Sequence, residues 1–145
     1  MQTDKNAEAL SSLLRGEMSA VETYDQALKK LNDDAAITQE LTRCRSSHQD
    51  RVNMLRGEVS RFGGKAPDGS GPWGAFAKLV EGGAKVFGKK AAIAALEEGE
   101  DHGLKQYRKD LAKLDASVRS TLEARLLSEQ EQTHRAMSDL KRTIH

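Results

Sequence analysis

The sequence predicts a single all-α domain, residues 1–145, made of four long amphipathic helices. Apolar residues recur every three or four positions along most of the chain, and the alternating pattern typical of strands is absent. This pattern stops once, between Gly63 and Lys90, where eight of the twelve glycines and both prolines lie. A chain of 145 residues has the length of one domain with one core. We therefore expect two helical hairpins, one on either side of a long loop.

The first hairpin is expected to consist of helices at residues 4–30 and 35–62, joined by the short turn 31–34. So short a turn makes the two helices antiparallel neighbours. Asp34 stands where the capping residue of the second helix is expected. Each helix carries one stripe of residues that should face the core. These are Leu10, Leu14, Glu17, Val21, Tyr24 and Leu28 in the first helix, and Ile37, Leu41, Cys44, His48, Leu55 and Phe62 in the second.

The second hairpin is expected at residues 89–113 and 116–144, with Asp115 as the cap of its second helix. The crossover between the hairpins, residues 63–88, allows the second and third helices to run parallel. A simple up-and-down bundle would need no such detour, so this connectivity is that of an antiparallel ferritin-like four-helix bundle. The inward residues are Ile93, Glu97, Glu100, Leu104, Tyr107 and Leu111, followed by Leu122, Leu126, Gln130, Thr133, Met137, Leu140 and Ile144.

The crossover carries a short amphipathic helix of its own, at about residues 73–87. Trp73, Phe76 and Phe87 share one face, at about 100° per residue, and lysines lie opposite. One interpretation is a helix that lies on a membrane surface. The other is a strap that packs its aromatic residues on the bundle. We favour the strap, because Gly82–Gly83 would weaken an isolated helix and the rest of the chain offers no anchor.

Charge and cysteine content argue against several classes of function. The 23 basic and 22 acidic residues give a net charge of +1 and form no basic block, so we expect no nucleic-acid partner. The single cysteine, Cys44, cannot form an internal disulfide, as is typical of a reducing compartment. No secretory signal is visible, and no stretch approaches the roughly 18 apolar residues of a membrane span. We expect a cytoplasmic protein without a membrane partner.

Polar residues on the inward stripes are the most informative feature of the sequence. An unpaired charge is costly to bury, so these residues need partners. Carboxylates and imidazoles from all four helices should converge on one layer at mid-bundle, which is how four-helix bundles hold a pair of iron or manganese ions. The alternative is a hydrogen-bonded layer that only fixes the register of the helices. The residues placed at this height by counting from the two hairpin turns are Glu17, His48, Glu97, Glu100, Glu129, Gln130 and His134.

Two sets of residues resemble known families. Glu17 and Tyr24, seven residues apart, are similar to the first-helix iron-ligand segment of bacterioferritins. Residues 97–101 (Glu-Glu-Gly-Glu-Asp) with Leu104 and Tyr107 after them, together with Gly63–Gly64 and Trp73, resemble the bacterial family called domain of unknown function 2383. This second resemblance covers nearly the whole chain. It implies a ferritin-like fold and supplies no established activity.

The ferritin-like pattern implies glutamate on the first and third helices and Glu-x-x-His on the second and fourth. On the second helix, Arg45 stands three residues before His48 where glutamate is expected. On the fourth helix, Glu131 and His134 fit the Glu-x-x-His motif in sequence. Helical geometry, however, turns Glu131 away from the core and places His134 at the edge of the inward face. The predicted metal ligands are Glu17, His48, Glu97, Glu100 and His134, with Glu129, Glu131 and Gln130 less favoured and with Tyr24 and Tyr107 beside them.

The sequence leaves two main functions open. The first is a ferritin-like protein that binds iron, as one ion or a di-iron pair, with chemistry of Fe(II) and dioxygen or peroxide. The alternative is a metal-free structural or stress-associated bundle that acts through protein–protein interaction. Peripheral membrane binding through residues 73–87 is a third hypothesis. Pairing of copies through an outer helix face is compatible with each of them.

Overall fold

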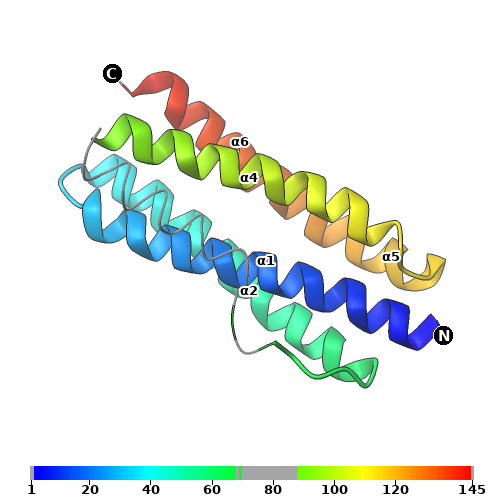
Figure 1. Ribbon diagram of the computed structural model, residues 1–145. Coiled ribbons are helices and arrows are strands. Elements are labelled where there is room, and N and C mark those ends of the chain that lie inside the picture. Colours follow the sequence, from blue (N-terminus) through cyan, green and yellow to red (C-terminus); the bar gives the residue numbers. More distant parts are fainter. Residues whose placement is uncertain (1, 68, 70–87, 145) are drawn as a thin grey trace.

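The computed structural model describes residues 2–67, 69 and 88–144, and most of these are helical (Figure 1). The helices are α1 (Gln2–Lys30), α2 (Ala35–Arg61) and α4 (Lys89–Leu111), followed by a last rod of α5 (Ala116–Leu122), the π-helical segment η2 (Glu123–Leu127) and α6 (Ser128–Thr143). For these described residues, the prediction of an all-helical protein with four long helices is confirmed, and the helix ends fall within two residues of the expected ones. The expected helix at residues 73–87 lies outside the described residues.

The described chain runs back and forth along one long axis (Figure 1). α1 and α2 lie side by side and run in opposite directions, as do α4 and the α5–α6 rod. α2 and α4 run in the same direction. α1 packs mainly on α2, α4 packs mainly on α6, and α1 also lies against α4, whereas α2 and α6 are in looser contact. The two hairpins therefore meet chiefly through α1 and α4.

The two predicted helix caps have different outcomes. Asp34 caps α2 as predicted, because its Oδ1 accepts a hydrogen bond from the backbone N–H of Ile37 at 3.1 Å. Asp115 is the N-cap residue of α5, as predicted, but its side chain makes no capping hydrogen bond. Its carboxylate instead accepts from the Asn6 side-chain amide at 3.1 Å, and its backbone N–H donates to Asn6 Oδ1 at 3.1 Å. The buried Asn6 thus ties the α4–α5 connection to the start of α1.

The apolar core forms two clusters, one toward each end of the bundle. The first includes Leu10 and Leu14 of α1 with Leu55 of α2, and the second includes Ile37 and Leu41 of α2. Between them, each of the four helices places polar side chains in the interior. Six buried polar residues of this middle zone are linked to one another by hydrogen bonds or ion pairs and are here called the polar layer: Glu17, His48, Arg51, Glu100, Gln130 and Thr133.

The π-helical segment keeps the last rod facing the core. Leu122, Leu126 and Gln130 follow Val118 at steps of four residues, and three such steps would turn a regular α-helix about 120° past three full turns. A π turn holds more residues than an α turn. η2 therefore absorbs the excess rotation, and Leu122, Leu126 and Gln130 are all buried.

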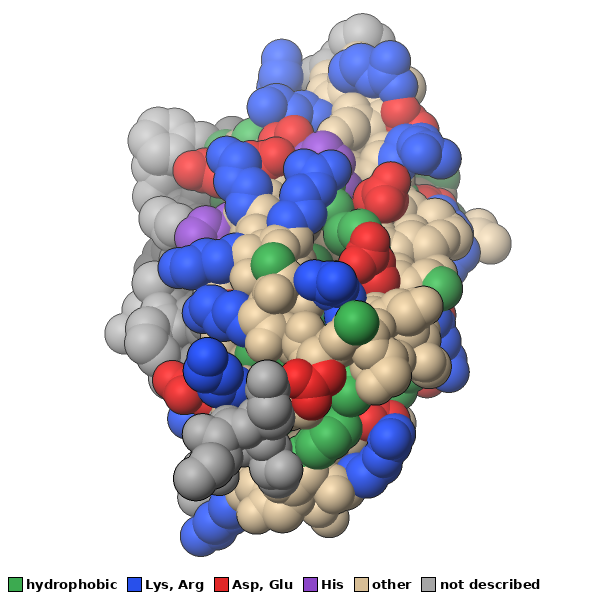
Figure 2. Space-filling model, turned by 90° about the vertical axis from the view of Figure 1, so that its right-hand side faces the viewer, with side chains coloured by type: hydrophobic (Ala, Val, Ile, Leu, Met, Phe, Trp, Pro, Cys, Tyr) green, Lys and Arg blue, Asp and Glu red, His purple; other side chains and the backbone are tan. Residues whose placement is uncertain are grey.

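The described surface carries charges of both signs. On the face drawn in Figure 2, Lys and Arg side chains are interspersed with Asp and Glu side chains, and hydrophobic side chains are scattered among them. Among the described residues, no helix combines the length and the apolar character that crossing a membrane requires.

Candidate functional site

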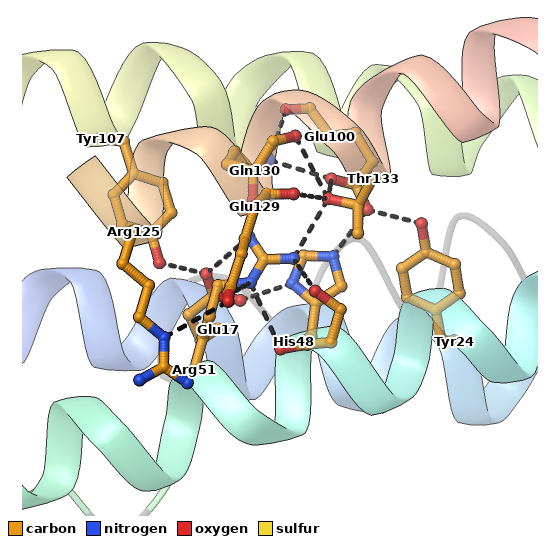
Figure 3. Close-up of polar contacts among 11 residues, drawn as sticks. Glu17, Tyr24, His48, Arg51, Glu100, Tyr107, Arg125, Glu129, Gln130 and Thr133 are labelled. Atoms are coloured by element: carbon orange, nitrogen blue, oxygen red, sulfur yellow. Dashed lines mark hydrogen bonds and ion pairs between the residues drawn. The ribbon is translucent and has the colours of Figure 1, made fainter. Parts of the chain in front are cut away.

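His48 lies at the centre of the polar layer, between two carboxylates (Figure 3). Its Nδ1 is 2.5 Å from Glu17 Oε1, and its Nε2 is 2.6 Å from Glu100 Oε2. An ionised carboxylate can only accept hydrogen bonds, and a neutral imidazole has only one N–H to donate. Both contacts are satisfied at once by the protonated ring. Burial and Arg51 act to lower the pKa of His48, but Glu100 and Glu17 outweigh them and raise it above the ordinary value.

Arg51 is the second cation of the layer, and its side chain is fully buried. It comes from α2, one helical turn after His48, and reaches across to α6. Its Nη1 donates to Gln130 Oε1 at 2.5 Å and lies 3.2 Å from Glu17 Oε2, while Nη2 donates to Thr133 Oγ1 at 3.1 Å. Burial disfavours the charged guanidinium, but Glu17 and other acidic groups raise its pKa further above the ordinary value, so the group stays charged.

Glu100 of α4 accepts four hydrogen bonds from side chains of the layer and its border. Oε2 accepts from His48 and, at 2.5 Å, from the hydroxyl of Tyr24. Oε1 accepts from Gln130 Nε2 at 2.9 Å and from the Thr133 hydroxyl at 2.8 Å. These donors match the roughly four acceptor positions of a carboxylate. Burial alone would raise the pKa of Glu100, but His48, Arg51 and Tyr24 lower it to about 2.

Glu17 of α1 has three partners, and each of its oxygens has at least one. Oε1 pairs with His48, and Oε2 accepts from the Tyr107 hydroxyl and pairs with Arg51. Burial opposes ionisation, but Arg51 and His48 hold the pKa of Glu17 below its ordinary value. The layer thus contains two carboxylates and two cations, and its formal charges cancel.

The two tyrosines expected beside the ligands border the layer, one in each apolar cluster. Tyr24 donates to Glu100 and stacks on the His48 ring with centroids 5.4 Å apart, and Tyr107 donates to Glu17. Burial and the adjacent carboxylates raise both tyrosine pKa values well above the ordinary value. Both hydroxyls therefore remain protonated donors.

The five predicted metal ligands do not come together. Glu17, His48 and Glu100 meet in the polar layer, but Glu97 and His134 lie apart from it, on a partly exposed side of α4 and α6. His134 Nε2 is 3.7 Å from Glu97 Oε1 and 3.8 Å from Asp101 Oδ1. These separations exceed hydrogen-bond length.

The less favoured positions also differ in outcome. Gln130 is buried in the layer, as the inward stripe suggested. Glu129 lies at its edge, with one oxygen 3.8 Å from Arg51 Nε and the other 3.4 Å from Arg125 Nε. Glu131 is exposed, in agreement with its expected outward direction. Of this group, Gln130 alone donates to a predicted ligand, Glu100.

Arg51 is the residue that the sequence reasoning missed. A charged arginine is rarely fully buried, so its charge argues against a core position. A signal was nevertheless present, because the inward stripe of α2 leaves a gap of seven residues between His48 and Leu55. Two helical turns need an inward residue between them. Arg51 and Val52 occupy that position, and both are buried.

A small pocket reaches the layer between α1 and α4. Its walls include the small residues Gly16 and Ala20 of α1 and Gly99 and Gly103 of α4, and Glu17, His48, Glu100 and Gln130 also line it. The cavity volume is about 50 Å³, enough for about three to five waters at roughly 10–15 Å³ each. Gly103 has a specific role, since a Cβ there would lie 2.8 Å from Gln130 Nε2.

The residues of the layer do not fit a bound metal as they stand. In the described part of the chain, no three His, Cys, Asp or Glu side chains are arranged to hold a metal ion. The partners of the carboxylates give a separate chemical argument against a metal. The oxygens of Glu17 and Glu100 already accept hydrogen bonds from protein groups, and Arg51 adds a positive charge beside them. A metal would have to displace these partners.

The comparisons with known proteins give one match. The family model described as Domain of unknown function (DUF2383) matches residues 5–113, which cover about three quarters of the chain. Neither the comparison with curated proteins nor that with solved structures gives any match.

Proposed function

We propose that this chain, which belongs to the family described as Domain of unknown function (DUF2383), is a metal-free structural bundle that acts by binding another protein. The observation that supports the metal-free part of the proposal is the buried Arg51, which pairs with Glu17 and donates to Gln130 and Thr133. A layer whose charges cancel and whose carboxylate oxygens all have protein partners needs no metal. It does hold four helices in one register, because a shifted helix would leave buried charges without partners.

The fold proposed with this function is ferritin-like. Two features of the structure support it: α2 and α4 run in the same direction (Figure 1), and each hairpin partner runs opposite. A cytoplasmic location is proposed as well, with support from the free, buried thiol of Cys44. A protein partner would then bind to the exposed faces of the helices, because the pocket at the layer has room for only a few waters.

A second candidate function is metal binding, with iron as the expected metal. It is favoured by one observation, the meeting of Glu17, His48 and Glu100 from three different helices within hydrogen-bond distance. In this alternative Arg51 would have to leave the layer. A protein that binds a metal only in its folded state gains stability, by about 2.7 kcal/mol at a ligand concentration of 100 times Kd.

Urea unfolding in the presence of a chelator, Fe(II) or Zn²⁺ separates the two candidates. The metal-free proposal predicts the same free energy of unfolding in all three solutions. A gain with either metal that disappears in Glu100→Gln would support the second candidate instead.

Photo-crosslinking in the producing cells tests the partner. A photoreactive residue is placed at exposed positions on each helix, such as Arg15, Arg56, Lys109 and Arg135. We expect adducts with one other protein, concentrated on one face of the bundle. Adducts between copies of the chain alone, or at none of the positions, would contradict the proposed mode of action.

A further inference from the structure

The inward positions of the layer match the spacing of a di-metal bundle but not its residues. Such bundles supply one glutamate from each of two helices and a Glu-x-x-His pair from each of the other two. Here α1 and α4 supply the single glutamates, Glu17 and Glu100. The pairs that face inward at a spacing of three are His48 with Arg51 on α2, and Gln130 with Thr133 on α6. The two single carboxylates and the spacing are kept, and the four paired positions hold other residues.

The guanidinium of Arg51 has the environment that a cation would need in this layer. One nitrogen is 3.2 Å from Glu17 Oε2. The other donates to Thr133 at 3.1 Å, and Thr133 donates in turn to Glu100 at 2.8 Å. Of the two carboxylates in the layer, Arg51 therefore contacts Glu17 directly and Glu100 through a single hydroxyl. The Glu129 carboxylate at the edge of the layer lies 3.8 Å from Arg51 Nε. Figure 3 shows the guanidinium among these groups, with Gln130 and Thr133 above it.

We infer that Arg51 is a resident cation that takes the place of a metal ion and determines that the layer excludes divalent cations. This inference rests on the proposed metal-free function. It goes further, because it assigns the exclusion to one side chain rather than to the whole layer.

Two physical effects support this assignment. A divalent ion among these carboxylates would lie close to a fixed positive charge in a buried site, where repulsion between like charges is strong. Arg51 also occupies acceptors that a metal would use, Glu17 Oε2 and Gln130 Oε1. Loss of the guanidinium would free Gln130 Oε1 and leave Glu17 Oε2 with the Tyr107 hydroxyl as its partner. The pocket between α1 and α4 is lined by Glu17, His48, Glu100 and Gln130, so a small ion inside it would lie beside these residues.

The test is to replace the resident cation by a metal ligand and to add Co²⁺ alone as the probe. The variant is Arg51→His with Gln130→Glu, which restores a second imidazole and a third carboxylate. The matched control is Arg45→His, because Arg45 lies on the same helix and pairs with the partly exposed Asp25. Binding is followed by the visible absorption of protein-bound Co²⁺ and by equilibrium dialysis.

We expect the double variant to bind Co²⁺ roughly 100-fold more tightly than the wild type or the control, since the change removes a repelling charge and adds two ligands. Adding Glu17→Gln should weaken that binding. If the variant is unfolded without metal, Co²⁺ should restore its helical circular dichroism, because metal binding is then coupled to folding.

Two results would contradict this account, and they affect different parts of it. A double variant that gains neither Co²⁺ binding nor cobalt-dependent folding would overturn the role of Arg51, while the metal-free function would stand. Wild-type protein that binds Co²⁺ in the layer, with absorption lost in Glu17→Gln, would overturn both the proposed function and this inference.

Discussion

Replacing Arg51 by methionine should be among the most destabilising single substitutions in the chain. Methionine fills most of the volume of the arginine stem but leaves Glu17 without its guanidinium partner, and Gln130 and Thr133 lose a donor each. Breaking a buried ion pair by removing one partner costs about 3–5 kcal/mol, because the other charge stays buried without compensation. For a domain of this size, that loss lowers Tm by roughly 6–20 °C, at about 2–4 °C per kcal/mol.

The assay is urea unfolding at pH 7, followed by far-ultraviolet circular dichroism. Arg45→Met is the control, since the Arg45 and Asp25 side chains are 34% and 43% exposed, and a surface pair contributes at most about 1 kcal/mol. Adding Glu17→Gln to Arg51→Met removes the uncompensated charge while keeping an acceptor for His48. The double variant should therefore recover at least about 1 kcal/mol relative to the sum of the single losses, as coupled neighbours do.

Arg51→Met would refute this reasoning if its free energy of unfolding matched that of Arg45→Met. Additive losses in the double variant would refute the pairing of Arg51 with Glu17 in particular. Either result would mean that the guanidinium is not the charge that balances the layer.

Three further predictions concern the surroundings of the layer. Gly103→Ala should destabilise the protein, because its Cβ would displace the Gln130 amide from Glu100. Gly57→Ala is the control: it has open space around it and should stabilise the protein by about 0.5–1 kcal/mol through helix propensity. The free energies of unfolding of both variants, measured by chemical unfolding, test this, and a stabilised Gly103→Ala would contradict the close contact. Glu100 has a pKa of about 2 in the folded protein against an ordinary value of 4.5, so its contribution to stability is present above pH 4.5 and lost as pH falls toward 2. The free energy of unfolding, measured between these pH values, should depend less on pH in Glu100→Gln than in the wild type. The same pH dependence in both proteins would contradict the lowered pKa. The thiol of Cys44, buried with its pKa raised to about 12 by burial and by Glu100, should react with a thiol reagent only after unfolding, and rapid labelling of native protein would show that the core is open there.

Local sequence signals were enough to predict the helices but not all of their ends. Asp34 caps α2 through a hydrogen bond to a residue three positions away, so the sequence around it suffices. Asp115 has equally good local chemistry, but its carboxylate is bound by Asn6, 109 residues away in sequence. A tertiary contact of that range is outside what helix periodicity can indicate. The π-helical segment was also unpredicted, although the repeated steps of four before Gln130 are compatible with it.

The sequence predicts the residues of the site where polar residues interrupt an apolar stripe. It fails where the direction of a side chain around its helix is not clear from the pattern. Glu17, His48 and Glu100 stand between apolar residues on their helices, and all three are buried. Glu97 was placed with Glu100, but residues three apart differ by about 60° around a helix, and the structure buries only Glu100. The position of Arg51 on its helix indicates the core, whereas its charge indicates the surface, so the sequence does not predict its burial. The mutual compensation of Arg51 and Glu17 becomes visible only when the four helices are assembled.

The iron content of the untagged protein, after anaerobic Fe(II) loading and desalting, tests most directly whether the polar layer is complete without a metal. Arg51 and the protein partners of both carboxylates predict wild-type protein that stays folded and retains no stoichiometric iron. One or two irons per chain, lost when both Glu17 and Glu100 are changed to glutamine, would contradict that prediction and establish the layer as a metal centre.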